Sequence, residues 1–253
     1  MSVLNKHVPA FAAICALAAT SAGSAMAGPL TFAQYVQANS GTQQWTVATT
    51  GNSTTVSASG QVSISFSGVP GLPFAGPEAA TFALNATSSQ LGNCGVNCGA
   101  GDSYVQPGYA GTFSFIDNGI NPGANLLSGT FAVTDSPATT GAQFSSSVGG
   151  SGGSFNASAT AGNLDQLILT SSYLSFHNVT EANASWSLSS MIPNFSTGTV
   201  TGDQAFPGGP FNASGSGTFS VNTPPDLIPE PVSASLLAVS VFGLGLVRRL
   251  RRA

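Results

Sequence analysis

Apolar and hydroxyl-bearing side chains alternate through most of this chain. Val62, Ile64 and Phe66 are separated by single serines, so in an extended chain the apolar residues face one way and the serines the other. Because successive side chains of a β-strand point to opposite faces, this period of two predicts half-buried strands of an antiparallel sheet. The alternation recurs in Trp45–Thr49, Phe82–Leu84, Phe113–Phe115, Phe131–Val133, Leu167–Leu169, Trp186–Leu188 and Phe219–Val221.

Turn-forming residues separate these segments, so the chain divides into roughly ten expected strands. The clearest turn signals are Gly51-Asn52, Asp117-Asn118-Gly119, Asn121-Pro122-Gly123 and Pro207-Gly208-Gly209-Pro210. We therefore predict an all-β domain over residues 28–222, an antiparallel β-sandwich or jelly roll with serine and threonine in solvent. One segment departs from the pattern. Phe32, Tyr35 and Val36 have the i, i+3, i+4 spacing of a helix, which predicts a short helix over residues 31–38.

Positive charge is confined to the two ends of the chain. The lysines and arginines are Lys6, Arg248, Arg249, Arg251 and Arg252, so none lies between Gly28 and Ile228. Eight carboxylates remain in that part: Glu78, Asp102, Asp117, Asp135, Asp165, Glu181, Asp203 and Asp226. With histidine neutral, eight carboxylates and no cation give a charge of −8. Nucleic-acid binding needs cations that displace phosphate counterions, so that function is excluded, and binding of the domain to anionic lipid headgroups is disfavoured.

Residues 1–27 have the organisation of a secretory signal peptide. Lys6 supplies the positive start, and Val8–Ala19 is the apolar segment, expected as a helix. Ala25 and Ala27 flank Met26 in a small-x-small cleavage site for signal peptidase. The sequence therefore predicts an exported protein.

The other end combines two prolines, an apolar helix and a basic cluster. Thr223-Pro224-Pro225 begins a stiff Pro-rich stalk over residues 223–228, and Pro229-Glu230-Pro231 predicts an extended junction after it. Val232–Val247 is free of charge and predicts a single transmembrane helix of about 24 Å. Arg248, Arg249, Arg251 and Arg252 act as a stop-transfer signal that stays cytoplasmic.

This order of Pro-Glu-Pro, apolar segment and terminal arginines resembles the PEP-CTERM sorting signal. The resemblance covers residues 229–253 and implies that a membrane transpeptidase of the exosortase class cleaves at Pro229–Pro231. It also implies an inner-membrane-anchored precursor that later reaches the cell surface or extracellular matrix, in a setting of exopolysaccharide and biofilm production. A permanent membrane anchor without cleavage is the alternative interpretation.

Cys94 and Cys98 stand in a Cys-x-x-x-Cys pair within a loop rich in glycine and asparagine. In an exported protein with two cysteines left after signal-peptide removal, a disulfide that fixes this surface loop is the favoured interpretation, with free thiols as the alternative. The sequence offers no further histidine or cysteine nearby for a metal, so no metal site is predicted there.

Few residues suggest chemistry. His177 is the one histidine after residue 27, and a surface or structural role is favoured for it. Asp102 and the Asp117–Asn121 turn could place oxygens around calcium, but Asn-Gly turn chemistry explains them as well. Trp45 and Trp186 fall on apolar faces and are expected in the core.

Tyr104 and Tyr109 lie in a Gly/Pro loop and are the candidate glycan contacts.

These observations predict a non-catalytic protein of the cell surface or extracellular matrix, without a cofactor. The alternative is a cell-surface module that binds carbohydrate or, with less support, ice. Ice binding would need flat threonine arrays, for which only Thr197, Thr199 and Thr201 alternate suitably. A weak hydrolase using Asp165 and Glu181 is the least favoured hypothesis.

Overall fold

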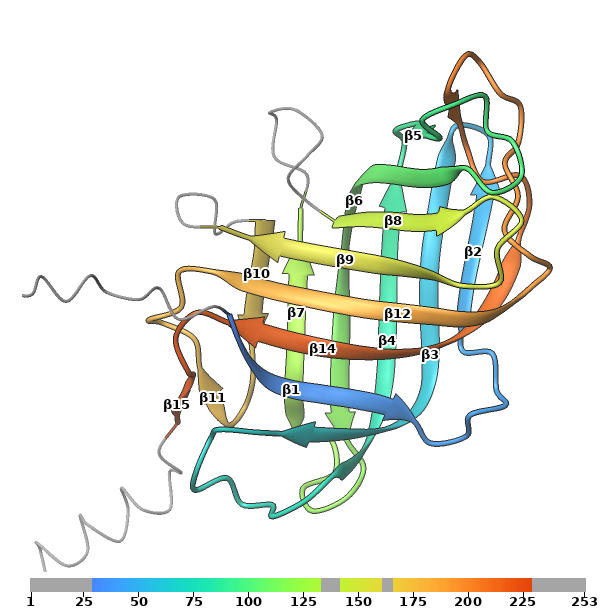
Figure 1. The fold of residues 1–253 in the computed structure, drawn as a ribbon. Helices are drawn as coiled ribbons and strands as arrows, with labels where there is room; N and C mark the ends of the chain where they lie inside the picture. Colours follow the sequence, from blue (N-terminus) through green and yellow to red (C-terminus); the bar gives the residue numbers. More distant parts are fainter. Residues whose placement is uncertain (1–28, 133–141, 161–165, 229–253) are drawn as a thin grey trace, which may run out of the picture.

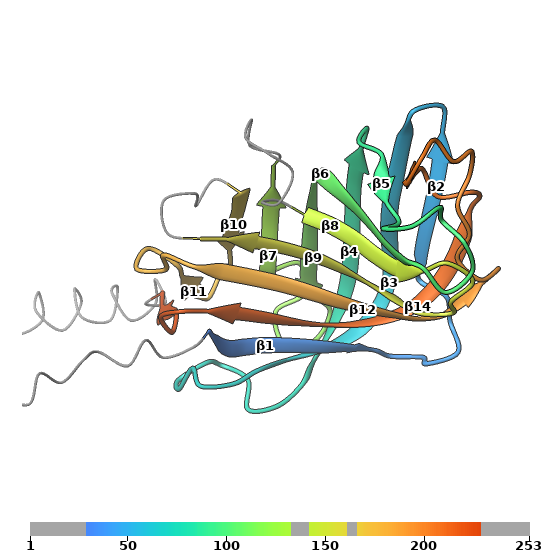
Figure 2. The same ribbon diagram turned by 45° about the horizontal axis from the view of Figure 1, so that its top comes forward.

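The computed structural model describes residues 29–132, 142–160 and 166–228, and almost all of its regular structure is β-strand. The strands form two layers, and Figures 1 and 2 show the strands of one layer running across those of the other. The first layer contains, in spatial order, β8 (Ala142–Ser147), β9 (Gly153–Ala159), β12 (Ala182–Ile192), β14 (Phe211–Val221) and β1 (Leu30–Gln37). The second contains β10 (Leu167–Thr170), β7 (Asn125–Phe131), β6 (Ser103–Asp117), β4 (Glu78–Ser88), β3 (Ser53–Phe66) and β2 (Trp45–Thr50). The all-β prediction is confirmed.

The two layers are joined by hydrogen-bonded strands at their corners. The first half of β6 pairs with β8, whereas its second half pairs with β4 and β7. Similarly, the end of β3 pairs with β1, and the start of β14 pairs with β2. Backbone pairing therefore runs in a closed ring, β8-β9-β12-β14-β1-β3-β4-β6 and back to β8. The two layers are thus parts of one continuous sheet, whose shared strands bend from one layer into the other as in orthogonal packing.

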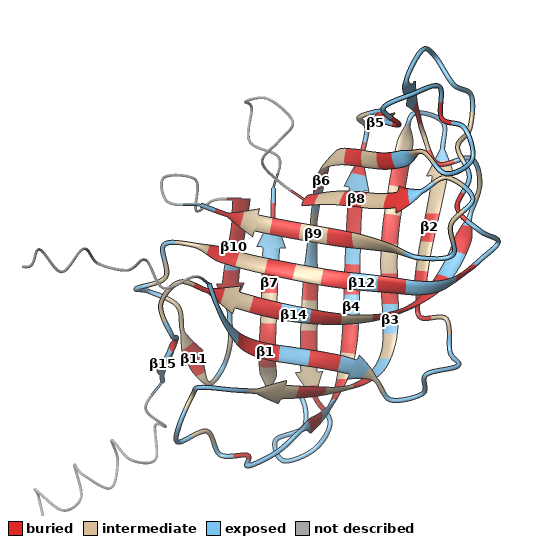
Figure 3. Cartoon of the chain, viewed as in Figure 1, coloured by how far each residue is buried: buried red, intermediate tan, exposed pale blue. Residues whose placement is uncertain are grey.

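The core fills the space between the layers, and Figure 3 shows buried residues alternating with exposed ones along the strands. Trp45 and Trp186 are both fully buried, with ring centroids 6.3 Å apart. Phe155 and Phe219 pack against Trp186 with centroids 5.6 and 5.8 Å away. The expected core placement of both tryptophans is confirmed.

The helix predicted over residues 31–38 is wrong, because Leu30–Gln37 forms β1. A register shift between Thr31 and Ala33 leaves Phe32 as an extra residue opposite β14. This bulge brings Phe32, Ala33 and Tyr35 into the core together. The helical spacing of the apolar residues is thus produced by a bulged strand.

Four two-residue strands complete the described part of the chain. They are β5 (Gly92–Asn93), β11 (Leu174–Ser175), β13 (Gln204–Ala205) and β15 (Asp226–Leu227). β15 pairs with β11, and the Ile228 N–H donates to the Tyr173 carbonyl at 2.8 Å. Residues 226–228 therefore lie against the domain, and Pro225 is buried. The predicted stalk spans residues 223–228, and its part from Pro225 onward packs against the domain instead of extending away from it.

The predicted targeting segments lie outside the described residues. These are the signal peptide with Ala25 and Ala27, the Pro229–Pro231 junction, the helix over 232–247 and the arginine cluster. Within 29–132, 142–160 and 166–228, no helix has the length and apolar character needed to cross a membrane.

Candidate functional site

The outer face of the second layer carries rows of uncharged side chains, most of which can form hydrogen bonds. One row across neighbouring strands is Thr130, Thr112, Asn85, Ser57 and Thr46, and the next is Thr170, Ser128, Ser114, Ala83 and Ser59. We call these ten residues the hydroxyl face. All are exposed or half-buried, and none is ionisable. Strand geometry spaces such groups by about 4.8 Å across the sheet and about 6.7 Å along it, so the face is a regular neutral array.

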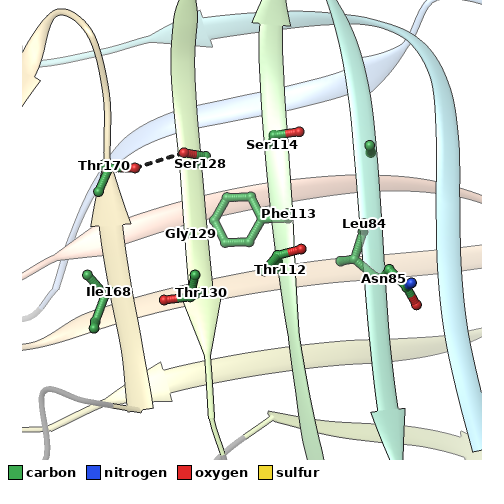
Figure 4. Close-up of a pocket in the computed structure, with 11 residues that line it drawn as sticks. Leu84, Asn85, Thr112, Phe113, Ser114, Ser128, Gly129, Thr130, Ile168 and Thr170 are labelled. Carbon is green, nitrogen blue, oxygen red and sulfur yellow. Dashed lines mark hydrogen bonds between the residues drawn. The ribbon is translucent and has the colours of Figure 1, made fainter.

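A shallow hollow of about 340 Å³ lies in the hydroxyl face, over β4, β6, β7 and β10 (Figure 4). It forms where Gly129 faces Phe113 across the β6–β7 pair, and a Cβ on Gly129 would come within 2.5 Å of the Phe113 ring. On its rim, the Ser128 and Thr170 hydroxyls are 2.8 Å apart, and the Asn125 Nδ2 donates to Ser128 Oγ at 2.8 Å. The hollow therefore combines the apolar side chains of Leu84, Phe113 and Ile168 with a few neutral donors and acceptors.

The first layer presents a similar outer surface. Its longest row is Gln143, Asn156, Ser185, Thr218 and Gln34, which lie opposite one another on five neighbouring strands. Ser185 Oγ donates to Asn156 Oδ1 at 2.6 Å, so part of the row is internally bonded. The rows on both outer faces are thus polar without being charged, and the exposed Ile168 and Val36 add one apolar side chain to each face.

A larger groove, of about 690 Å³, lies at one end of the domain beside β5. We call it the amide groove, and its lining is Gln90, Leu91, Asn93, Val105, Pro107, Gln143 and Gln204. Four of these side chains are amides, which both donate and accept hydrogen bonds. The remaining three are aliphatic, so the groove combines an apolar surface with neutral polar groups.

Tyr104 and Tyr109 are not surface glycan contacts, because both are fully buried. A register shift between Gln106 and Tyr109 in the β6–β8 pairing adds a residue, and the two tyrosines, five positions apart, therefore both point inward. Tyr104 Oη donates to the Ala205 carbonyl at 3.1 Å, and Tyr109 Oη donates to Gln106 Oε1 at 2.6 Å. Burial raises the pKa of both phenols well above the usual range, so both stay protonated.

The outward positions in this segment belong to Val105 and Pro107, which line the amide groove. The segment does lie at the surface, as predicted, but its tyrosines face the core and Val105 and Pro107 face solvent. Gln90, Gln143 and Gln204 come from distant parts of the chain, and no motif in the sequence links them.

Cys94 and Cys98 form the predicted disulfide, with Cα atoms 4.9 Å apart. Both half-cystines are buried next to the amide groove. The Cys94 N–H donates to the Asp203 carbonyl at 2.8 Å, which ties the loop to the turn before β13. The disulfide therefore braces the segment that carries Asn93.

The two parts of the alternative calcium site serve separate turns. Asp117 is buried and accepts the N–H groups of Gly119 and Asn121 at 2.6 and 2.8 Å. Asp102 accepts the Gly99 N–H at 2.7 Å in another loop. No group of three or more histidine, cysteine or carboxylate side chains comes together in the described parts of the chain.

Ser175, His177 and Asp226 meet at the β11–β15 pair, a combination that resembles a catalytic triad. Ser175 Oγ lies 3.0 Å from His177 Nδ1, and Asp226 Oδ2 lies 3.8 Å from the same nitrogen. A triad uses one ring nitrogen for the serine and the other for the carboxylate, so this geometry cannot relay a proton from serine. The side chains of His177 and Asp226 are also 64% and 59% exposed, so the site excludes no water.

The remaining candidates are not brought together. Thr197 and Thr201 lie in isolated bridges with Pro207 and Gln204, and no strand carries the alternating threonines as a flat array. Glu181 is half-buried, with its N–H donating to Asn222 Oδ1 at 3.1 Å. Asp165 lies outside the described residues.

Fold and surfaces together define an all-β domain with neutral, hydrogen-bonding outer faces and one amide-lined groove. Comparisons with protein families, with curated proteins and with solved structures find no match.

Proposed function

We propose that this chain is an exported, non-catalytic protein of the cell surface or extracellular matrix that associates with neutral exopolysaccharide. Signal peptidase removes residues 1–27. An exosortase-like transpeptidase then processes the membrane-anchored precursor at Pro229–Pro231. The observation that carries the proposal is the pair of outer faces rich in hydroxyl and amide groups, on a domain without a single lysine or arginine between Gly28 and Ile228.

The chemistry of these faces favours a neutral, hydroxylated partner. Hydroxyl and amide groups can bind sugar hydroxyls directly or through ordered water at little cost. With eight carboxylates and no lysine or arginine, the domain has a charge of −8 with histidine neutral, which repels acidic polymers. The same charge argues against partners recognised by basic patches, such as nucleic acids.

A specific carbohydrate-binding role is the second candidate, and the amide groove favours it. Ice binding gains no such support, since Thr197 and Thr201 lie in separate bridges with different partners. Among the described residues, the Ser175, His177 and Asp226 arrangement gives no support to a hydrolase.

Mass spectrometry of the protein recovered outside the cell tests the sorting step. We expect a C-terminus within Pro229–Pro231 in cells with an exosortase, and an intact arginine tail in the membrane when Pro229-Glu230-Pro231 is replaced by three alanines. An intact tail on the extracellular wild-type protein would contradict sorting.

Retention in isolated matrix tests the second step. Because neutral hydrogen bonding is insensitive to ionic screening, the released protein should stay with the matrix in both low and high salt. Elution by salt alone would show that charge holds it, and would refute the neutral-polysaccharide part of the proposal.

A further inference from the structure

We propose that the amide groove is a specific site for a short segment of a neutral polysaccharide chain. The inference rests on the proposed function and adds the place and the chemical class of the ligand. The volume of about 690 Å³ falls within the range of about 300–1,000 Å³ that is usual for small-molecule sites.

Two amides of the groove are free to bind a ligand. Within the described structure, no hydrogen bond occupies the side chains of Gln143 and Gln204. They come from β8 and β13, so they project from separate strands into one groove. Each amide offers both donors and an acceptor, which matches sugar hydroxyls that also do both.

Of the other two amides, that of Asn93 is fixed by hydrogen bonds, whereas Gln90 is held through its backbone alone. The Gln90 carbonyl accepts Gln106 Nε2 at 2.7 Å, which holds the backbone at this residue. Asn93 Nδ2 donates to Asp203 Oδ2 at 3.1 Å, and its Oδ1 accepts the Gly95 N–H at 2.7 Å. A site that combines fixed and free polar groups can position a ligand at a limited entropic cost.

The apolar part of the groove suits the C–H face of a sugar ring. Val105 and Pro107 are outward residues of β6, and Leu91 lies beside them with 39% of its surface exposed. Ligand sites typically combine such apolar lining with a few placed polar groups.

The strands below hold this lining rigidly. Gly92 packs against the Tyr104 ring so closely that a Cβ would clash with it.

Charge and pairing exclude the other main ligand classes. No ionisable side chain lines the groove, and Asp203, which contacts Asn93, disfavours an anionic ligand. A peptide could bind by adding a strand to an open edge. However, β5 is already flanked by β6 and β13, so its backbone is occupied. A neutral oligosaccharide is the class that remains.

The test uses the full chain in detergent micelles, titrated with neutral hexasaccharides of β-1,4- and β-1,3-linked glucose and with an acidic oligogalacturonate. The test variant is Gln143→Ala/Gln204→Ala. The control variant is Gln34→Ala, an exposed glutamine at the far end of the same surface row as Gln143. Circular dichroism and thermal unfolding verify that all variants are folded.

We expect a neutral hexasaccharide to bind, and its affinity to fall about tenfold or more in the double variant, since two ligand hydrogen bonds are lost. Gln34→Ala should leave the affinity unchanged. An equal loss in Gln34→Ala, no loss in the double variant, tighter binding of the acidic sugar, or no binding of either neutral sugar would each overturn the groove site. The sorting and retention experiments are independent of this outcome, so failure of the groove is distinguishable from failure of the proposed function.

Discussion

Replacing Gln106 with leucine should destabilise the domain more than any other single loss of a buried amide. Gln106 is fully buried, and its side chain makes three hydrogen bonds. It accepts from Tyr109 Oη at 2.6 Å, and its Nε2 donates to Thr54 Oγ1 at 3.0 Å and to the Gln90 carbonyl at 2.7 Å. Gln106→Leu keeps the volume similar but removes all three bonds.

The size of the effect follows from the partners that remain. Thr54 has a second contact, with Thr49 Oγ1 at 3.2 Å, so its hydroxyl is still satisfied. The buried Tyr109 hydroxyl and the carbonyl of the half-buried Gln90 each lose the Gln106 side chain as a partner, and a stranded buried group costs about 1–3 kcal/mol. Burial of the added apolar surface returns about 1 kcal/mol. We therefore expect a loss of about 3 kcal/mol, equivalent to a melting-temperature decrease of roughly 6–12 °C.

Urea unfolding followed by tryptophan fluorescence measures this loss. Trp45 and Trp186 are fully buried at the centre of the core, so their emission reports global unfolding. Gln61→Leu is the matched control, because Gln61 is exposed and its side chain bonds Thr81 at 3.1 Å on the surface. The control should change the free energy of unfolding by no more than about 0.5 kcal/mol.

A double-mutant cycle with Tyr109→Phe isolates the buried hydrogen bond. Removing both partners leaves no stranded hydroxyl, so Gln106→Leu/Tyr109→Phe should be more stable than the sum of the single losses by about 1–2 kcal/mol. Strict additivity, or a Gln106→Leu variant as stable as Gln61→Leu, would refute the role assigned to this network.

Three further predictions concern other parts of the domain. Gly129→Ala should lose about 1–3 kcal/mol by overpacking against the Phe113 ring, whereas Gly41→Ala, with open space around it, should not; thermal unfolding compares the two. Burial, and then the nearby Asp117, raise the pKa of Glu78, so the contribution of Glu78 to stability falls as pH rises from the ordinary carboxyl range through that raised pKa. Glu78→Gln should therefore be more stable than wild type at pH 7, and the difference should vanish below about pH 4. Denaturation curves recorded at both pH values measure this, and a stability difference that grows as pH falls would contradict the assignment. Reduction of the Cys94–Cys98 disulfide, which closes a very short loop, should cost no more than about 2 kcal/mol, and a larger loss in denaturant titrations would give it a wider structural role.

The strands and most of the core could be predicted because the two-residue alternation of apolar and polar side chains indicates both where a strand runs and which of its residues face inward. Phe82, Leu84 and Phe115 are buried at the positions that the alternation assigns to the inner face. The rule fails where a strand contains an extra residue. At β1 and in the middle of β6, bulges reverse the facing of the residues that follow, and no local signal in the sequence marks them.

The groove could not be predicted, because its residues are brought together by the pairing order of distant strands. Gln143 lies on β8 and Gln204 on β13, and both reach the groove through their neighbours β6 and β5. Such long-range pairings leave no trace in composition or spacing. The Gly/Pro-rich segment that carries Tyr104 and Tyr109 was the one local signal near this end of the domain, although the two tyrosines themselves are buried.

The pairing of β15 with β11 has a consequence for the proposed membrane-anchored precursor. Ile228 is fastened to Tyr173, and the expected membrane helix starts at Val232, so only residues 229–231 connect them. If residues 232–247 form the proposed membrane helix, three extended residues spanning about 10 Å would bring the β11 end of the domain close to the lipid surface. The folded domain would then sterically hinder a transpeptidase that approaches Pro-Glu-Pro. Dissociation of β15 from β11 would lengthen the linker to nine residues, counted from Thr223 to Pro231. The pairing of Asp226 and Leu227 with β11 would then control whether the enzyme can bind the Pro-Glu-Pro segment.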